Sequence, residues 1–149
     1  MRTVARSHDD RVSRIVDWYE QLTPAALPRI DELYGRGARF KDPFNEVQGR
    51  KAIRAIFEHM YRQLQAPRFV VRDAVAQGDT AFLTWTLHYR RSARAPREQS
   101  IRGCTELRFG ADGRVTLHRD YWDAAEELYE KLPLLGVVMR AIKRRLRAR

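Results

Sequence analysis

The spacing of apolar residues changes part-way along this chain, and the change limits the folds that the chain can adopt. Between residues 9 and 64, apolar residues recur every three or four positions, a spacing typical of helices that bury one face. Between residues 67 and 122 they alternate with polar residues, which indicates strands. The sequence therefore predicts helices at 9–22, 24–34 and 51–64, strands at 67–77, 81–90, 101–109 and 114–122, and a final helix capped by Asp123. Helices segregated from an antiparallel sheet make an α+β fold.

Charge and cysteine content exclude several classes of protein. The chain has 149 residues and a formal net charge of +10, but six of its Lys and Arg residues lie among the last ten. The remaining charge of +4 is ordinary for this size, so we predict no nucleic-acid partner. No stretch approaches the roughly 18 apolar residues of a membrane span, and Cys104 is the only cysteine. We therefore expect a cytoplasmic protein without an intrachain disulfide.

Short motifs mark the ends of the predicted elements. Phe40-Lys41-Asp42-Pro43-Phe44 separates the second helix from the third, and the last strand opens with Gly113-Arg114-Val115 and closes with Tyr121-Trp122. Together with the order of elements, these motifs resemble the ketosteroid-isomerase-like (SnoaL-like) branch of the nuclear transport factor 2-like superfamily over residues 8–125. The resemblance implies a cone-shaped α+β fold, in which a curved, mainly antiparallel sheet wraps around three N-terminal helices and an apolar pocket. We expect this single domain at 1–133, followed by a basic amphipathic C-terminal helix at 134–149.

The resemblance also assigns roles to residues. In the isomerases, the Asp of the Asp-Pro motif removes a proton beside a carbonyl group, while a Tyr and a protonated Asp donate hydrogen bonds to the oxyanion. Asp42 falls on the base, Trp18 on the oxyanion Tyr and Thr105 on the oxyanion Asp. Of the two supporting tyrosines, Tyr34 is kept, whereas Phe57 stands in place of the other. The base is thus present without its oxyanion donors, which argues against steroid isomerisation by that mechanism.

The last predicted strand carries polar groups that the isomerases lack. Alternation puts His118, Asp120 and Trp122 on one face, and the resemblance turns this face toward the pocket. His118 and Asp120 then form a second acid/base pair that faces Asp42 across the cavity. Cone-fold dehydratases and epoxide hydrolases use polar sets of this kind. Phe44, in the Asp-Pro motif, is predicted to line the same pocket.

Each of these assignments has a plainer interpretation. Asp42 precedes a proline and, from the residues alone, is typical of a turn carboxylate bonded to its own backbone. His118 and Asp120 have a spacing found in metal sites, but no third ligand is indicated, so we predict a hydrogen-bonded pair and no metal. The aromatic residues could be ordinary core rather than ligand-binding: Trp18, Phe44, Phe57 and Trp122.

The strand at 81–90 has apolar residues on both faces. The register implied by the resemblance turns one set toward the pocket: Phe82, Thr84, Thr86 and His88. His88 is therefore a further candidate ligand-binding residue. The opposite set is the more apolar: Leu83, Trp85, Leu87 and Tyr89. Because an exposed apolar patch of this size is unusual, we predict that this outer face is buried in a homodimer.

These patterns predict a protein that binds a small apolar or carbonyl-containing molecule. If it is an enzyme, it transfers a proton without a cofactor, as an isomerase or dehydratase does, with Asp42 as base and His118 with Asp120 as acid or electrophile. The alternative is a non-catalytic member of the fold that binds a ligand or another protein. For the tail at 134–149 we favour packing against the domain or its dimer mate, and contact with a membrane surface is the alternative.

Overall fold

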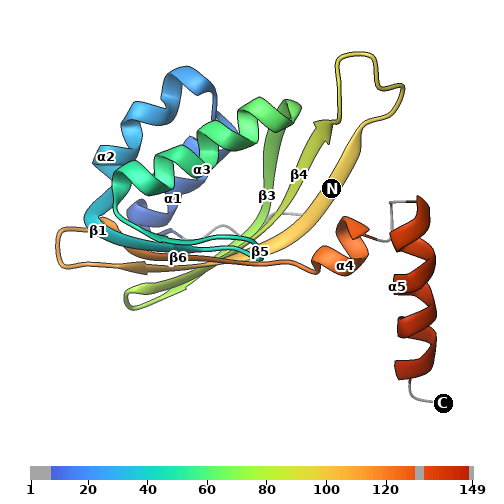
Figure 1. Ribbon diagram of the computed structural model, residues 1–149. Helices are drawn as coiled ribbons and strands as arrows, with labels where there is room; N and C mark the ends of the chain where they lie inside the picture. The colour runs from blue at the N-terminus through green and yellow to red at the C-terminus, as the bar shows by residue number, and fades with distance from the viewer. Residues whose placement is uncertain (1–7, 130–132, 148–149) are drawn as a thin grey trace.

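The computed structural model describes residues 8–129 and 133–147, which Figure 1 shows as a curved sheet with helices on its concave side. The six strands follow the order β2-β1-β6-β5-β4-β3. The helices are α1 (Asp10–Glu20), the 3-10 helix η1 (Pro24–Arg29), α2 (Ile30–Leu33), α3 (Arg50–Gln63), α4 (Ala124–Glu127) and α5 (Pro133–Leu146). The strands are β1 (Tyr34–Lys41), β2 (Glu46–Gln48), β3 (Gln65–Gln77), β4 (Thr80–Arg90), β5 (Gln99–Phe109) and β6 (Val115–Tyr121). The predicted cone-shaped α+β fold is confirmed.

Local sequence signals set the starts of the first two helical segments. Asp9 caps α1 and Thr23 caps η1, each by accepting a hydrogen bond from a backbone N–H of the first turn. The predicted second helix at 24–34 is divided, because Pro28 has no N–H with which to continue an α-helical ladder. One short α-helical segment, α2, follows, and Tyr34 already belongs to β1.

The first strand of the chain lies beside the last. β3 to β6 form the predicted antiparallel meander, whereas β1 pairs with β6 in parallel, with Phe40 opposite His118 and Lys41 opposite Arg119. The sequence did not predict this register. Because of it, the turn after β1, which contains Asp42, lies next to the end of β6.

The two faces of β4 are reversed relative to the prediction. Its more apolar set is buried on the concave side of the sheet: Leu83, Trp85, Leu87 and Tyr89. On the other face Phe82 is 42% exposed, Thr86 is buried, and Nδ1 of His88 lies 3.1 Å from a carboxylate oxygen of Glu98. The prediction that His88 lines the pocket is therefore wrong, because burial of the more apolar face decides the orientation. The apolar face from which the homodimer was inferred is therefore not the outer face of the sheet. The homodimer stays a prediction.

Trp85 fits on the concave face because its partner on β5 has no side chain. Trp85 lies opposite Gly103 in the β4–β5 pairing. A Cβ atom on Gly103 would lie 2.5 Å from the indole ring, far inside van der Waals contact. Glycine at this position therefore lets the indole lie across β5 and reach Thr105, two residues further along that strand.

The last helix, α5, stands apart from the sheet beyond α4 (Figure 1). It approaches the body through Lys143, whose Nζ lies 3.7 Å from the carboxylate of Glu126. Its apolar stripe is not covered by its own domain, since Leu134 is 86% exposed and Leu146 is 79% exposed. Within the described ranges, no helix combines the length and the apolar character needed to cross a membrane.

Candidate functional site

A cavity of about 420 Å³ lies between α3 and the sheet. This volume is within the range of roughly 300–1,000 Å³ that is typical of small-molecule sites. Most of its wall is apolar and comes from α3, β3, β4 and β5: Ile56, Phe57, Met60, Phe69, Trp85, Leu87, Tyr89 and Ile101. Phe44 and Trp122 also line it, with ring centroids 5.6 Å apart. Two carboxylates share this apolar cavity, those of Asp42 and Asp120.

Asp120 is held by two neighbours in the sheet, one of which is itself held by Trp85. Trp85 donates its indole N–H to Oγ1 of Thr105 at 2.7 Å, and the Thr105 hydroxyl donates to Oδ1 of Asp120 at 2.6 Å. Nε2 of His118 lies 2.7 Å from the same Asp120 oxygen. The expected pair of His118 and Asp120 is thus in place, at the centre of a longer hydrogen-bond network.

Two tyrosines hold the other ring nitrogen of His118, which is 2% exposed. Nδ1 lies 2.7 Å from the hydroxyl of Tyr19 and 2.8 Å from that of Tyr34, and the two hydroxyls are 2.7 Å apart. Two phenol protons satisfy this triangle if one phenol donates to the other and the second donates to Nδ1. We therefore assign a neutral imidazole with its proton on Nε2, which donates to Asp120.

The two phenols are fixed as neutral donors. Burial raises the pKa of both Tyr19 and Tyr34 well above the usual value of 10. Tyr34 and then Asp120 add to the rise in the pKa of Tyr19, and Asp120 adds to that of Tyr34. Neither phenol ionises near neutral pH, so the orientation of the His118 ring is preserved across that range.

The two oxygens of Asp120 have different surroundings. Oδ1 accepts the hydrogen bonds from Thr105 and His118, whereas Oδ2 makes no hydrogen bond with any described residue. The side chain is 17% exposed and lines the 420 Å³ cavity. His118 does not line this cavity, but it shares with Asp120 the wall of a smaller space of about 20 Å³, room for about one water molecule. The carboxylate therefore offers one oxygen to a ligand, while the imidazole supports it from behind.

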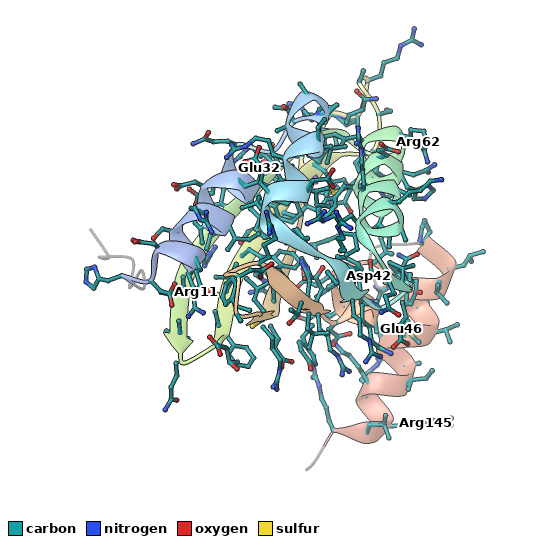
Figure 2. All side chains as sticks on the ribbon, turned by 90° about the vertical axis from the view of Figure 1, so that its left-hand side faces the viewer. Arg11, Glu32, Asp42, Glu46, Arg62 and Arg145 are labelled. Carbon is teal, nitrogen blue, oxygen red and sulfur yellow. The ribbon has the colours of Figure 1, made fainter. Side chains whose placement is uncertain are left out.

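Asp42 lines the same cavity, but the turn after β1 occupies its carboxylate. Oδ1 accepts hydrogen bonds from the backbone N–H groups of Phe44 (2.8 Å) and Asn45 (2.6 Å). The side-chain amide of Asn45 reaches both oxygens of Asp42 at 3.1 Å. This is the turn geometry that the residues alone indicated. Figure 2 shows Asp42 close to the end of β1.

Besides His88, three residues that were expected to contact a ligand do not line the large cavity: Trp18, Tyr34 and Thr105. Trp18 is buried behind Phe57, with ring centroids 5.5 Å apart, and donates its indole N–H to the carbonyl of Ala26 at 3.1 Å. Tyr34 belongs to the network behind Asp120 and does not line the large cavity. Trp18 is therefore core, and Tyr34 acts on His118. Among the described residues, no three His, Cys, Asp or Glu side chains gather as metal ligands would.

Sequence reasoning missed Tyr19 and Trp85. The spacing of Tyr19 with Ile15 and Val16 predicted a buried position, and a buried phenol usually needs a hydrogen-bond partner. That signal could have identified Tyr19, one residue from the position that the resemblance selected. Trp85 was placed on the outer face by the reversed register, although the apolar character of its face indicated burial.

Comparison with known families identifies the family of this chain. The SnoaL-like domain family matches residues 15–118, more than half of the chain. This chain belongs to the SnoaL-like family. The matched segment includes Tyr19, Tyr34, Asp42, Thr105 and His118, and it ends two residues before Asp120. No functionally curated protein matches the chain.

Solved structures show the same fold at low sequence identity. A protein with a ketosteroid isomerase-like fold from Catenulispora acidiphila DSM 44928, solved with trimethylamine, is 17% identical over 82% of this chain and 92% of its own, with a TM-score of 0.68. An M. tuberculosis LEH-like epoxide hydrolase is 16% identical over 89% of both chains, with a TM-score of 0.64. TerC, co-crystallised with polyporic acid, is 16% identical over 79% of this chain and 95% of its own, with a TM-score of 0.68. These likenesses establish the cone fold.

Proposed function

We propose that this SnoaL-like protein binds a small, mostly apolar, carbonyl-containing molecule in the 420 Å³ cavity and moves a proton on it with the carboxylate of Asp120. The reaction would be a cofactor-free isomerisation or dehydration. One observation supports this most directly: Oδ2 of Asp120 has no hydrogen-bond partner among the described residues, and the Asp120 side chain lines an apolar cavity. Such an oxygen accepts a proton from a bound ligand without first losing a hydrogen bond.

The network behind Asp120 suits it to both protonation states. Before transfer, Oδ1 accepts hydrogen bonds from Thr105 and from Nε2 of His118. After transfer, the proton sits on Oδ2, and Oδ1 still accepts the same two bonds as the carbonyl-like oxygen. Thr105 and His118 are therefore positioning residues in this proposal. His118 supports the Asp120 carboxylate and does not act as the acid or electrophile that was predicted from the sequence.

The opposite wall supplies donors for the carbonyl oxygen. His59 and Gln63 of α3 line the cavity and carry N–H groups. A hydrogen bond from either group would stabilise the negative charge that develops on the carbonyl oxygen when Asp120 removes the neighbouring proton. Return of the proton to a different carbon completes an isomerisation, whereas transfer of the proton from Asp120 to a hydroxyl group on the β-carbon, which then leaves as water, completes a dehydration and restores the carboxylate.

The experiment compares two carboxamide variants. Asp120→Asn removes the proposed base, and Asp42→Asn keeps an oxygen that can accept the turn N–H groups. In a screen of ketones, enones and β-hydroxy ketones, we expect Asp120→Asn to lower kcat/KM by about 10²- to 10⁴-fold and Asp42→Asn to change it far less. Loss of turnover in Asp42→Asn with full activity in Asp120→Asn would overturn the assignment and restore Asp42 as the base.

Ligand binding without turnover is the second candidate function. It is favoured by the two positions that carry oxyanion donors in the isomerases: the Trp18 N–H is bonded to Ala26 and the Thr105 hydroxyl to Asp120. Neither group is available to a ligand. This candidate predicts that the wild type and Asp120→Asn bind a cavity ligand with measurable affinity while no carbonyl compound is converted.

Two further expectations belong to the proposal. We retain a homodimer formed through the outer sheet face, where Val75 and Phe82 are exposed cross-strand neighbours. We also retain a cytoplasmic location. Both are predictions that rest on the sequence and on the fold.

A further inference from the structure

The C-terminal helix separates apolar and cationic side chains onto opposite faces. Leu134, Val138 and Ile142 follow one another at intervals of four and share one face of α5. On an ideal helix, with 3.6 residues per turn, the opposite side carries mainly basic residues: Arg140, Lys143, Arg144 and Arg147. Arg145 is the exception and lies on the apolar side, in the last turn of the helix. No residue between 133 and 147 is acidic. The helix therefore has the two-faced composition of segments that lie in a membrane interface.

The apolar face of α5 is exposed. Figure 1 shows the helix projecting beyond α4, away from the sheet. Apart from Gly136, no residue of α5 for which burial is described is buried. The exposed apolar side chains run the length of the helix: Leu134, Leu135, Val137, Val138, Ile142 and Leu146. Such a continuous apolar surface is costly in water and marks a site that another apolar phase covers.

The cationic side chains near the end of the helix also face solvent. Arg144, Arg145 and Arg147 are exposed, and Figure 2 shows Arg145 near the end of α5. The one ion pair that links described residues of α5 and α4 joins Lys143 to Glu126. The three arginines therefore add positive charge beside the exposed apolar face.

We propose that α5 docks the protein onto an anionic lipid surface, with the apolar face in the interface and the arginines against lipid phosphates. Such a surface supplies both an apolar phase and negative charge. A second copy of this chain brings a further net charge of +10, which opposes the cationic face. The phosphates of a nucleic acid would pair with the arginines, but the apolar face would remain in water.

This docking would place the cavity near the membrane. Leu128, which follows α4 directly, lines the 420 Å³ cavity, and Phe44 on the same wall lies 6.4 Å from the ring of Tyr129. Leu128 and Tyr129, the last described residues before α5, thus lie at or beside the edge of the cavity. A ligand that partitions into lipid would reach the cavity from the surface to which α5 binds.

The test measures cosedimentation of the full-length protein with vesicles of phosphatidylcholine, with and without phosphatidylglycerol. We expect binding to the anionic vesicles that weakens at about 0.5 M salt, where surface charges are screened within a few ångströms. The triple variant Arg144→Glu, Arg145→Glu and Arg147→Glu should bind at least about tenfold more weakly. The double variant Val138→Ser and Ile142→Ser, which keeps every charge, should also bind more weakly because it removes apolar contact.

A matched variant controls for net charge. Arg91→Glu, Arg94→Glu and Arg97→Glu change the charge of the chain by the same amount in the exposed β4–β5 loop. We expect this variant to bind anionic vesicles as the wild type does, and circular dichroism should show that all variants fold. Equal loss in the two triple variants, or no binding of the wild type, would overturn the proposal. So would a dimer that becomes a monomer in Val138→Ser/Ile142→Ser, or salt-sensitive binding to nucleic acid but not to vesicles.

Discussion

The carboxylates of Asp42 and Asp120 line one cavity, yet their hydrogen bonds suit them to different tasks. The donors on Asp42 are mostly backbone N–H groups of its own turn, which cannot rotate away to release it. The donors on Asp120 come from side chains and gather on one oxygen. A candidate base thus differs from a structural carboxylate in having one oxygen atom without a hydrogen bond, which a ligand can contact.

A residue-scale prediction concerns the buried phenols of Tyr19 and Tyr34. Folding raises the pKa of both, so above about pH 10 the unfolded chain releases these protons while the folded chain keeps them. The contribution of the neutral phenols to the free energy of unfolding is complete below pH 10. Above pH 10 it falls by about 1.4 kcal/mol per pH unit for each tyrosine.

The measurement is the free energy of unfolding in urea between pH 9 and about pH 11.5. Tyr19→Phe/Tyr34→Phe should be less stable than the wild type at neutral pH by about 1–3 kcal/mol, because Nδ1 of His118 loses its donors. Above pH 10 its stability should decline less steeply. Equal slopes in the two proteins would contradict the buried, neutral state of the phenols.

At the scale of elements, two pairings build the site. The parallel β1–β6 pair brings the Asp42 turn to the end of β6. The β4–β5 pair puts Trp85 opposite Gly103, so that the indole reaches Thr105 and, through it, Asp120. The hydrogen bonds that hold the Asp120 carboxylate on β6 thus depend on the absence of a side chain at Gly103 on the neighbouring strand β5.

Gly103→Ala tests that dependence. The added methyl group would overlap the Trp85 ring, so we expect a loss of about 1–3 kcal/mol in the free energy of unfolding, together with a shift in tryptophan fluorescence. Gly37→Ala in β1 is the matched control, since its Cβ would meet the nearest side-chain atom at 3.8 Å and fits without strain. If both variants are equally stable, Gly103 has no special role in seating the indole.

At the scale of the whole molecule, the body and α5 are nearly independent. The core is formed by α1, η1, α2, α3 and the sheet, whereas α5 contributes exposed apolar and basic side chains. A helix that buries so little of itself adds little to the stability of the body. We therefore relate its composition to the lipid surface proposed above.

Truncation after Tyr129 should therefore leave the body intact. The deletion removes the ion pair between Lys143 and Glu126, an exposed contact worth at most about 1 kcal/mol. We expect the urea midpoint and the near-ultraviolet circular dichroism of the truncated chain to match those of the full chain. A loss of more than about 2 kcal/mol would show that α5 packs on the body or on a partner copy after all.

The sequence by itself determined the order of helices and strands, the cone fold, and the pairing of His118 with Asp120. The order of elements and the placing of His118 with Asp120 on one face follow from periodicity, capping and alternation, which act between residues close in the chain, whereas the cone fold was implied by the family resemblance. The apolar character of one face of β4 also indicated which face is buried, against the register that the resemblance implied. Only the tertiary structure decided that Tyr19 rather than Trp18 joins the network and which carboxylate keeps an oxygen for a ligand. Those outcomes depend on contacts between residues far apart in the chain, such as Tyr19 and His118, which are 99 residues apart. A local sequence pattern does not show which of several side chains makes such a contact.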